Sequence, residues 1–120
     1  MTSTTANVHP TATIGEGTVL GEHCVVGANV KLGPGCVVGN FVVLHDDTVV
    51  GRDVRIDDQA VLAKKPMRAA NSATTKEQAL PPLTLGDGCI VGTGVVLYRG
   101  ATIDAKVLMA DLCTVRENVT

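Results

Sequence analysis

Aliphatic residues recur in this 120-residue chain at intervals of six, and this spacing constrains the fold more than any other feature. An α-helix would repeat its apolar positions about every 3.6 residues, and an amphipathic strand at every second residue. A fixed longer period indicates a solenoid, in which each repeat packs on the next. The anchors form one unbroken run and a second run after an interruption: Val8, Ile14, Leu20, Val26, Leu32, Val38, Leu44, Val50, Ile56 and Leu62, then Leu85, Val91, Leu97, Ile103, Met109 and Val115.

A second series, four residues after each anchor, consists mainly of small or β-branched side chains. Because six is a multiple of two, both series can face inward from short extended segments, with room for a corner in every repeat. Glycine often follows the anchor, as at Gly15, Gly21 and Gly33, and glycine is suited to corners that need close approach. Three such sides would close one coil, and successive coils would stack at the strand spacing of about 4.8 Å.

All four cysteines (Cys24, Cys36, Cys89 and Cys113) occupy the second inward series. If the interruption preserves the register, Cys36 and Cys89 share a side but lie two coils apart, about 9–10 Å. This separation is too large for a disulfide. The chain also lacks the C-x-x-C pairs that indicate zinc. We therefore expect free, buried thiols that pack as small apolar side chains.

Composition predicts one small domain over residues 8–120, preceded by a polar tail over residues 1–7. The net charge of −2 and the absence of a basic run argue against a nucleic-acid partner. No apolar stretch approaches the length of a membrane span, and the N-terminus does not resemble a signal peptide. We expect no membrane partner and a cytoplasmic location.

The repeat aliphatic–Gly–x–x–small–x, which opens with Val-His-Pro-Thr-Ala-Thr-Ile-Gly at residues 8–15, resembles the hexapeptide-repeat acyltransferases, nearest the branch that acylates sugar nucleotides. The resemblance implies an all-β fold: a left-handed parallel β-helix of about five coils with one extruded loop, assembled as a homotrimer. It also implies acyl-CoA-dependent transfer, with acetyl-CoA as donor and a hydroxyl or amine of a sugar or sugar nucleotide as acceptor. No metal is expected.

Two other functions compete with this interpretation. A γ-type carbonic anhydrase uses the same coil but binds zinc through three histidines, two of them close together. This chain has only His9, His23 and His45, without a close pair, which argues against that activity. A non-catalytic scaffold or assembly module, or a shortened and inactive homologue, is the second alternative. It arises because the last hexad ends at Thr120 without a capping helix.

Residues 63–84 break the repeat between the anchors Leu62 and Leu85, and we call this segment loop 63–84. A loop this long in a compact fold is usually functional or disordered. Lys64, Lys65 and Arg68 make it basic, which suits the phosphates of coenzyme A or of a nucleotide-linked sugar. In the resembled family such a loop helps to enclose the active site against a neighbouring subunit. The alternative is a solvated surface excursion.

His45 stands at a corner position where glycine is common, and Asp46 and Asp47 follow it. Transfer of an acyl group to a hydroxyl or amine gains from a base that removes the proton, and histidine titrates in the useful range. A neighbouring carboxylate can orient the imidazole. We therefore expect His45 to be the catalytic base and Asp46 its carboxylate partner. The alternative is a solvated corner histidine beside two turn-forming aspartates.

Later coils supply the remaining candidates. Arg99 could bind a phosphate, and Tyr98 could stack on a ligand or hydrogen-bond it. Equally, both could make contacts between subunits. In the resembled family the acyl-CoA lies between adjacent subunits beside the later coils, which points by position to Gly92, Gly94 and Arg99. Asn40 and Tyr98 are the candidate contacts to the acceptor.

Overall fold

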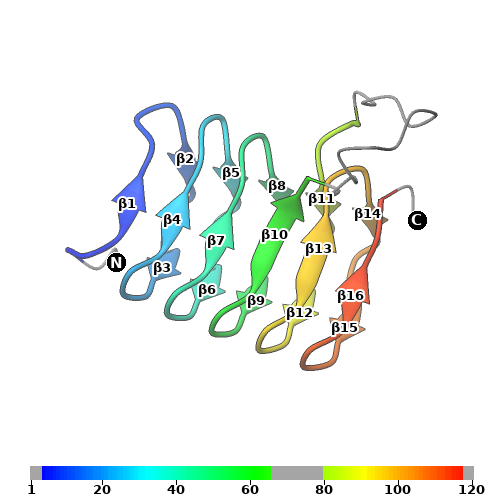
Figure 1. The fold of residues 1–120 in the computed structure, drawn as a ribbon. Coiled ribbons are helices and arrows are strands. Elements are labelled where there is room, and N and C mark those ends of the chain that lie inside the picture. The colour runs from blue at the N-terminus through cyan, green and yellow to red at the C-terminus, as the bar shows by residue number, and fades with distance from the viewer. Residues whose placement is uncertain (1–3, 66–79, 118–120) are drawn as a thin grey trace.

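The computed structural model describes residues 4–65 and 80–117, which form short parallel strands wound into a solenoid (Figure 1). The strands are β1 (Asn7–Val8), β2 (Thr13–Ile14), β3 (Val19–Leu20), β4 (Val25–Val26), β5 (Lys31–Leu32), β6 (Val37–Val38), β7 (Val43–Leu44), β8 (Val49–Val50), β9 (Arg55–Ile56), β10 (Val61–Lys64), β11 (Thr84–Leu85), β12 (Ile90–Val91), β13 (Val96–Tyr98), β14 (Thr102–Ile103), β15 (Leu108–Met109) and β16 (Thr114–Val115). The predicted left-handed parallel β-helix is confirmed. No helix in these ranges could cross a membrane.

Every third strand belongs to the same sheet, so the chain visits three faces in turn. Sheet 1 has the order β1-β4-β7-β10-β13-β16, sheet 2 contains β2, β5, β8, β11 and β14, and sheet 3 contains β3, β6, β9, β12 and β15. The three sheets hold six, five and five strands, which matches the expected number of coils. Across loop 63–84, Leu62 pairs with Leu97 and Val50 with Leu85, so the loop leaves the coil register intact.

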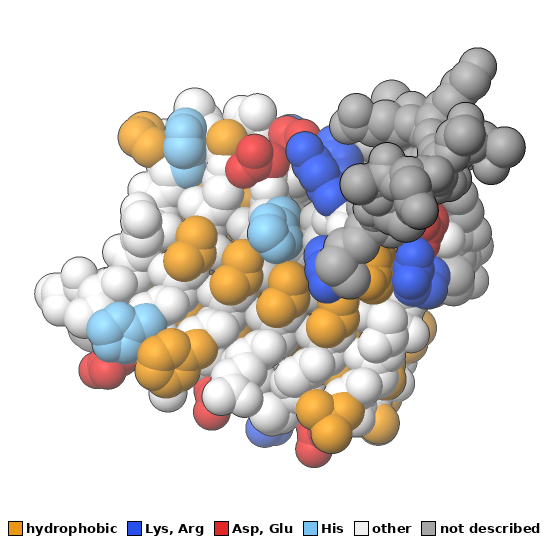
Figure 2. All heavy atoms as spheres, in the orientation of Figure 1, with side chains coloured by type: hydrophobic (Ala, Val, Ile, Leu, Met, Phe, Trp, Pro, Cys, Tyr) orange, Lys and Arg blue, Asp and Glu red, His pale blue; other side chains and the backbone are white. Residues whose placement is uncertain are grey.

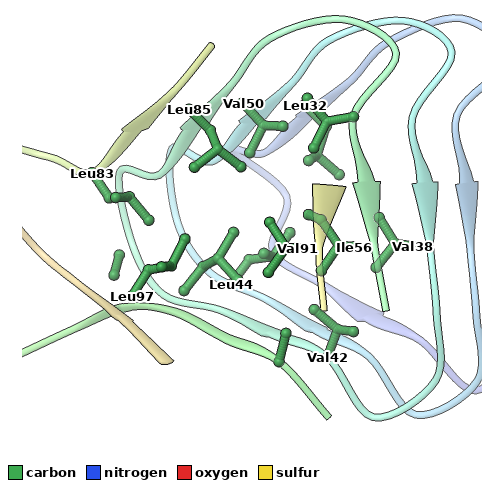
Figure 3. Packing of buried hydrophobic residues seen from close by; sticks show 14 of the residues in the cluster. Leu32, Val38, Val42, Leu44, Val50, Ile56, Leu83, Leu85, Val91 and Leu97 are labelled. Carbon is green, nitrogen blue, oxygen red and sulfur yellow. The ribbon is translucent and has the colours of Figure 1, made fainter. Parts of the chain in front are cut away.

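The core follows directly from the two inward series. In β4, for example, Val25 is 45% exposed whereas the anchor Val26 is only 2% exposed. Equivalent anchors stack on one another from coil to coil, as Figure 3 shows for Val38, Ile56 and Val91. Each fully buried aliphatic side chain contributes about 1.5–3 kcal/mol relative to an exposed one.

The cysteines occupy the predicted inward positions. All four are free; Cys24, Cys36 and Cys89 are buried, and Cys113 is partly exposed. Burial raises the pKa of the Cys24 thiol. The three buried thiols also have a role that the sequence did not predict, because each donates a weak hydrogen bond over 3.0 to 3.2 Å to a corner carbonyl of the next coil.

We expect the native protein to expose one reactive thiol. Reaction with a chromogenic disulfide reagent should label Cys113 readily and the three buried cysteines only after denaturation, because the reagent cannot reach a buried thiol. The absorbance of the released chromophore, measured before and after addition of urea, counts the accessible and the buried thiols. The variant Cys113→Ser should lose the native reaction, and rapid labelling that persists in it would contradict this assignment.

The coil extends into both ends of loop 63–84. Strand β10 continues to Lys64, with Ala63 buried, and Leu83 is buried again before β11. Residues 66–79 lie outside the described ranges. At the other end of the chain, β1 begins at Asn7, beside the expected limit of the N-terminal tail.

Candidate functional site

A cavity of about 560 Å³ lies at the corner that follows the strands of sheet 1, where loop 63–84 leaves the coil. Its size is in the range of about 300–1,000 Å³ that is usual for small-molecule sites. In Figure 2 charged side chains and a histidine gather beside a row of hydrophobic side chains on this face. Three successive coils line the cavity: His45 and Asp46 after β7, Val61, Ala63, Lys64 and Lys65 of and after β10, and Val96 and Arg99 of and after β13.

Lys64 reaches the cavity through a bulge in β10. Leu62 pairs with Leu97, but Tyr98 pairs with Lys64, so Ala63 is an extra residue in the strand. Ala63 is 1% exposed and has a φ of 66°, a left-handed conformation that costs a residue other than glycine about 1–2 kcal/mol. Bulges redirect side chains and are frequent beside active sites. Here the bulge buries the Ala63 methyl group and presents Lys64 to the cavity.

His45 presents an exposed side chain on a fixed backbone. Its N–H donates to the carbonyl of Leu62 over 3.0 Å, and its carbonyl accepts a hydrogen bond of 2.7 Å from the buried hydroxyl of Thr48. These two bonds fix the corner from which the side chain projects, and a catalytic group needs such a supported backbone. The geometry is therefore compatible with the predicted base, and its chemical role stays a prediction.

The Asp46 carboxylate is directed toward the preceding coil. Its Oδ1 accepts a hydrogen bond of 2.8 Å from the N–H of Ala28. The same bond recurs at other corners, where the acceptors are Asn40, Asp58, Asp87 and Asp111. Asp46 is thus one member of a ladder in which Asn and Asp side chains bind the backbone of the previous coil. Within the described residues no hydrogen bond joins Asp46 to the imidazole, so its orienting role stays a prediction.

Arg99 binds several groups at once. Its Nη2 lies 3.1 Å from Oδ2 of Asp47, Nη1 donates to the carbonyl of Asp46 over 3.0 Å, and Nε donates to the carbonyl of Leu80 over 3.1 Å. Oδ1 of Asp47 accepts a further bond of 3.3 Å from Asn29. No sequence signal connects Asp47 with an arginine 52 residues later, so this ion pair could not be predicted.

Tyr98 is only 5% exposed and packs against cations of its own chain. Nζ of Lys64 lies 5.7 Å from the centre of its ring, and Cζ of Arg116 lies 4.3 Å from it. Both distances are typical of cation–π contacts. Arg116 also donates to Glu117, and this hydrogen bond raises the pKa of Arg116. Tyr98 therefore supports Lys64 from beside the cavity rather than lining it.

The other candidates lie elsewhere. Asn40 precedes β7, and Gly92 and Gly94 precede β13, whereas His45 and Arg99 follow these strands. These three residues occupy the opposite corner of sheet 1 and do not line the cavity. Arg68 lies outside the described residues.

The cavity is more basic than the chain as a whole, which has a net charge of −2. The lining contains three cations, Lys64, Lys65 and Arg99, and a single carboxylate, Asp46. A second carboxylate, Asp47, is paired with Arg99. Such a surface favours an anionic ligand. In residues 4–65 and 80–117 there is no group of three His, Cys, Asp or Glu side chains that could hold a metal ion.

Two family models match the sequence. The bacterial transferase hexapeptide model (six repeats) matches residues 11–46, and the model for the hexapeptide repeat of succinyl-transferase matches residues 71–99. No curated protein matches the chain significantly.

Solved structures resemble the whole solenoid. The acetyltransferase domain of PglB from Neisseria gonorrhoeae is 21% identical, with a TM-score of 0.82 over 100% of this chain and 50% of that one. The same domain in complex with acetyl coenzyme A is 22% identical, with a TM-score of 0.76 over 96% of this chain and 50% of that chain. UDP-N-acetylglucosamine acyltransferase from Francisella novicida is 23% identical, with a TM-score of 0.73 over 98% and 46%. These likenesses establish the fold, and the chain spans about half the length of each structure.

Proposed function

Because the chain belongs to the hexapeptide-repeat proteins, we propose that it is an acyl-CoA-dependent acyltransferase. We propose acetyl-CoA as the donor, a hydroxyl or amine of a sugar or sugar nucleotide as the acceptor, and the cytoplasm as its location. The observation that carries the proposal is the cavity, in which a histidine on a fixed backbone meets two lysines. The structural neighbours support it, since one binds acetyl coenzyme A and another is named for acylation of a nucleotide sugar.

The proposed reaction is direct attack on the thioester. The acceptor oxygen or nitrogen forms a bond to the thioester carbonyl carbon while the carbon–sulfur bond breaks. His45 takes the proton of the acceptor and returns it to the departing thiolate, so that the products are the acylated acceptor and free coenzyme A. Val61 and Val96 provide the apolar part of the wall.

Lys64 and Lys65 are proposed to bind the phosphates of the donor or of a nucleotide-linked acceptor. An ammonium group on a flexible stem binds phosphate as a point charge. Lys64 is held near the cavity by the bulge at Ala63 and by the ring of Tyr98. Both constraints come from the fold itself, so the site would require little rearrangement on binding.

We propose a homotrimer built through sheet 1. The outward positions of its central strands are valines in register, namely Val25, Val43, Val61 and Val96. Val25 is exposed and the other three are partly exposed. A contiguous apolar strip at the surface commonly marks an interaction surface, and Figure 2 shows a row of hydrophobic side chains beside the charged cluster. A contribution of Asn40, Gly92 and Gly94 to the site would then come from the opposite corner of a neighbouring subunit.

Calorimetric titration with acetyl-CoA, combined with a mass measurement in solution, tests the proposal. We expect a trimer that binds acetyl-CoA with a dissociation constant of about 1 μM to 1 mM, the usual range of substrate affinity. The double variant Lys64→Ala/Lys65→Ala should bind at least about tenfold more weakly, which corresponds to about 1.4 kcal/mol.

The exposed Lys31 on sheet 2 provides the matched control, and Lys31→Ala should bind as the wild type does. A trimer that ignores acetyl-CoA would favour a non-catalytic scaffold. A monomer would contradict the intersubunit part of the site.

A further inference from the structure

We infer that Arg99 is a positioning residue that fastens both ends of loop 63–84 to the corner carrying His45. This inference goes beyond the proposed function, and only its catalytic consequence rests on that function. The sequence alone suggests that Arg99 binds a phosphate or contacts a neighbouring subunit. The contacts of Arg99 point instead to a structural connection between the loop and the catalytic corner.

The first observation is that Arg99 touches both ends of the loop. Its backbone N–H donates to the carbonyl of Lys64, where the loop departs, over 2.9 Å. Its Nε donates to the carbonyl of Leu80, on the returning segment, over 3.1 Å. One residue therefore holds the departing and the returning chain at the rim of the cavity.

The second observation is that the same guanidinium reaches the His45 corner, two coils away. Nη1 donates to the carbonyl of Asp46 and Nη2 to the carboxylate of Asp47, the two residues that follow His45. The coil between them is the one that opens into loop 63–84, so its corner does not stack on the His45 corner in the ordinary way. Arg99 fills the resulting gap, because its planar fork can serve several acceptors at fixed angles.

The third observation is that this ion pair differs from the others in the described ranges. Three pairs join residues that are neighbours or next neighbours in sequence: Arg52–Asp53, Arg55–Asp57 and Arg116–Glu117. Arg99–Asp47 alone among the described pairs joins separate coils, and the Arg99 side chain is 19% exposed. Its partner Asp47 is 37% exposed, however, and a partly exposed pair contributes little free energy. The importance of the Arg99 contacts therefore lies in the geometry that they impose.

The test compares Arg99→Ala and Arg99→Lys with the wild-type protein, using acetyl-CoA as the donor probe. Arg99→Ala should lower kcat by about 10- to 100-fold and leave the KM for acetyl-CoA within about twofold, because a misplaced group weakens catalysis more than binding. Arg99→Lys should restore little, since one ammonium group cannot serve the three acceptors. The control Arg55→Ala removes an exposed arginine–aspartate pair on sheet 3 and should change neither parameter.

Two measurements on the free protein separate this inference from the proposed function. In Arg99→Ala, the NMR signals of the His45 ring should move, and the amide protons of Leu80, Leu83 and Thr84 should exchange faster with solvent. If Arg99→Ala does not fold, Asp47→Asn removes the ion pair more gently and should move the His45 signals in the same direction.

Unchanged His45 signals and unchanged exchange in these variants would overturn the inference, as would a tenfold rise in KM with normal kcat, which would identify a phosphate ligand. If the wild type transfers no acetyl group, the proposed function fails. The NMR and exchange results would still decide whether Arg99 holds this corner.

Discussion

Replacing His45 by alanine is expected to lower kcat for acetyl transfer by a factor of about 10² to 10⁴, the usual contribution of a general base. The KM for acetyl-CoA should change little, because the proposed donor contacts are Lys64 and Lys65. The fold should also be retained, since the ring is exposed and the His45 backbone is held by hydrogen bonds to the Leu62 carbonyl and the Thr48 hydroxyl. Steady-state assays of released coenzyme A measure both parameters.

The matched control for this variant is His23→Ala. His23 is also an exposed corner histidine, but its ring stacks on Phe41 at a distance of 5.3 Å, at the opposite corner of sheet 1. Turnover by His23→Ala should match the wild type. Normal turnover by His45→Ala would remove His45 from the mechanism and favour the solvated corner histidine.

The variant Asp46→Asn resolves the role of the neighbouring carboxylate. The amide oxygen of Asn40 accepts the equivalent hydrogen bond from the N–H of Glu22 in the preceding coil. An asparagine at position 46 can therefore keep the bond from the N–H of Ala28. The fold should therefore tolerate the change. A loss of turnover would then report on the charge of Asp46 and support the orienting role, whereas normal turnover would assign Asp46 to the ladder alone.

The fold could be predicted from the sequence because one period determines both the side-chain direction and the stacking register. The anchors Val50 and Leu85 illustrate this: they remain in register although loop 63–84 lies between them. The Asn and Asp ladder was also accessible in principle, since Asn40, Asp46 and Asp58 each stand two residues after an anchor. Asp46 also stands directly after His45, and this position favours the interpretation as an orienting carboxylate over its place in that series.

The remainder of the site depends on where the repeat is broken. The bulge at Ala63 was not predicted, because the other left-handed residues stand three places after an anchor, whereas Ala63 follows the anchor Leu62 directly. The contacts of Arg99 to Asp46 and Asp47 span 53 and 52 residues and form only because the intervening corner opens into the loop. Periodicity can locate such an interruption, but it does not specify which side chains cross the gap.

The largest expected loss of stability comes from Ile56→Ala, which should lower the free energy of unfolding by about 2–5 kcal/mol. Ile56 is 1% exposed and lies in sheet 3 between Val38 and Val91, its register partners in the preceding and following coils. Removing three carbon atoms there leaves a cavity that the two adjacent coils cannot fill without shifting their own strands. Urea unfolding followed by circular dichroism gives the free energy and its denaturant dependence.

Ile14→Ala is the matched control, because it makes the same change in the first full coil. Ile14 is partly exposed and has a single register partner in sheet 2, Leu32, because β2 is an edge strand of that sheet. In a solenoid, stability is approximately a sum of repeat terms and nearest-neighbour terms, so a terminal repeat contributes fewer of the latter. The loss at Ile14 should therefore be less than half the loss at Ile56. Equal losses in the free energy of unfolding at the two positions would contradict the nearest-neighbour description. They would indicate that the effect of a substitution does not depend on the position of its coil in the solenoid.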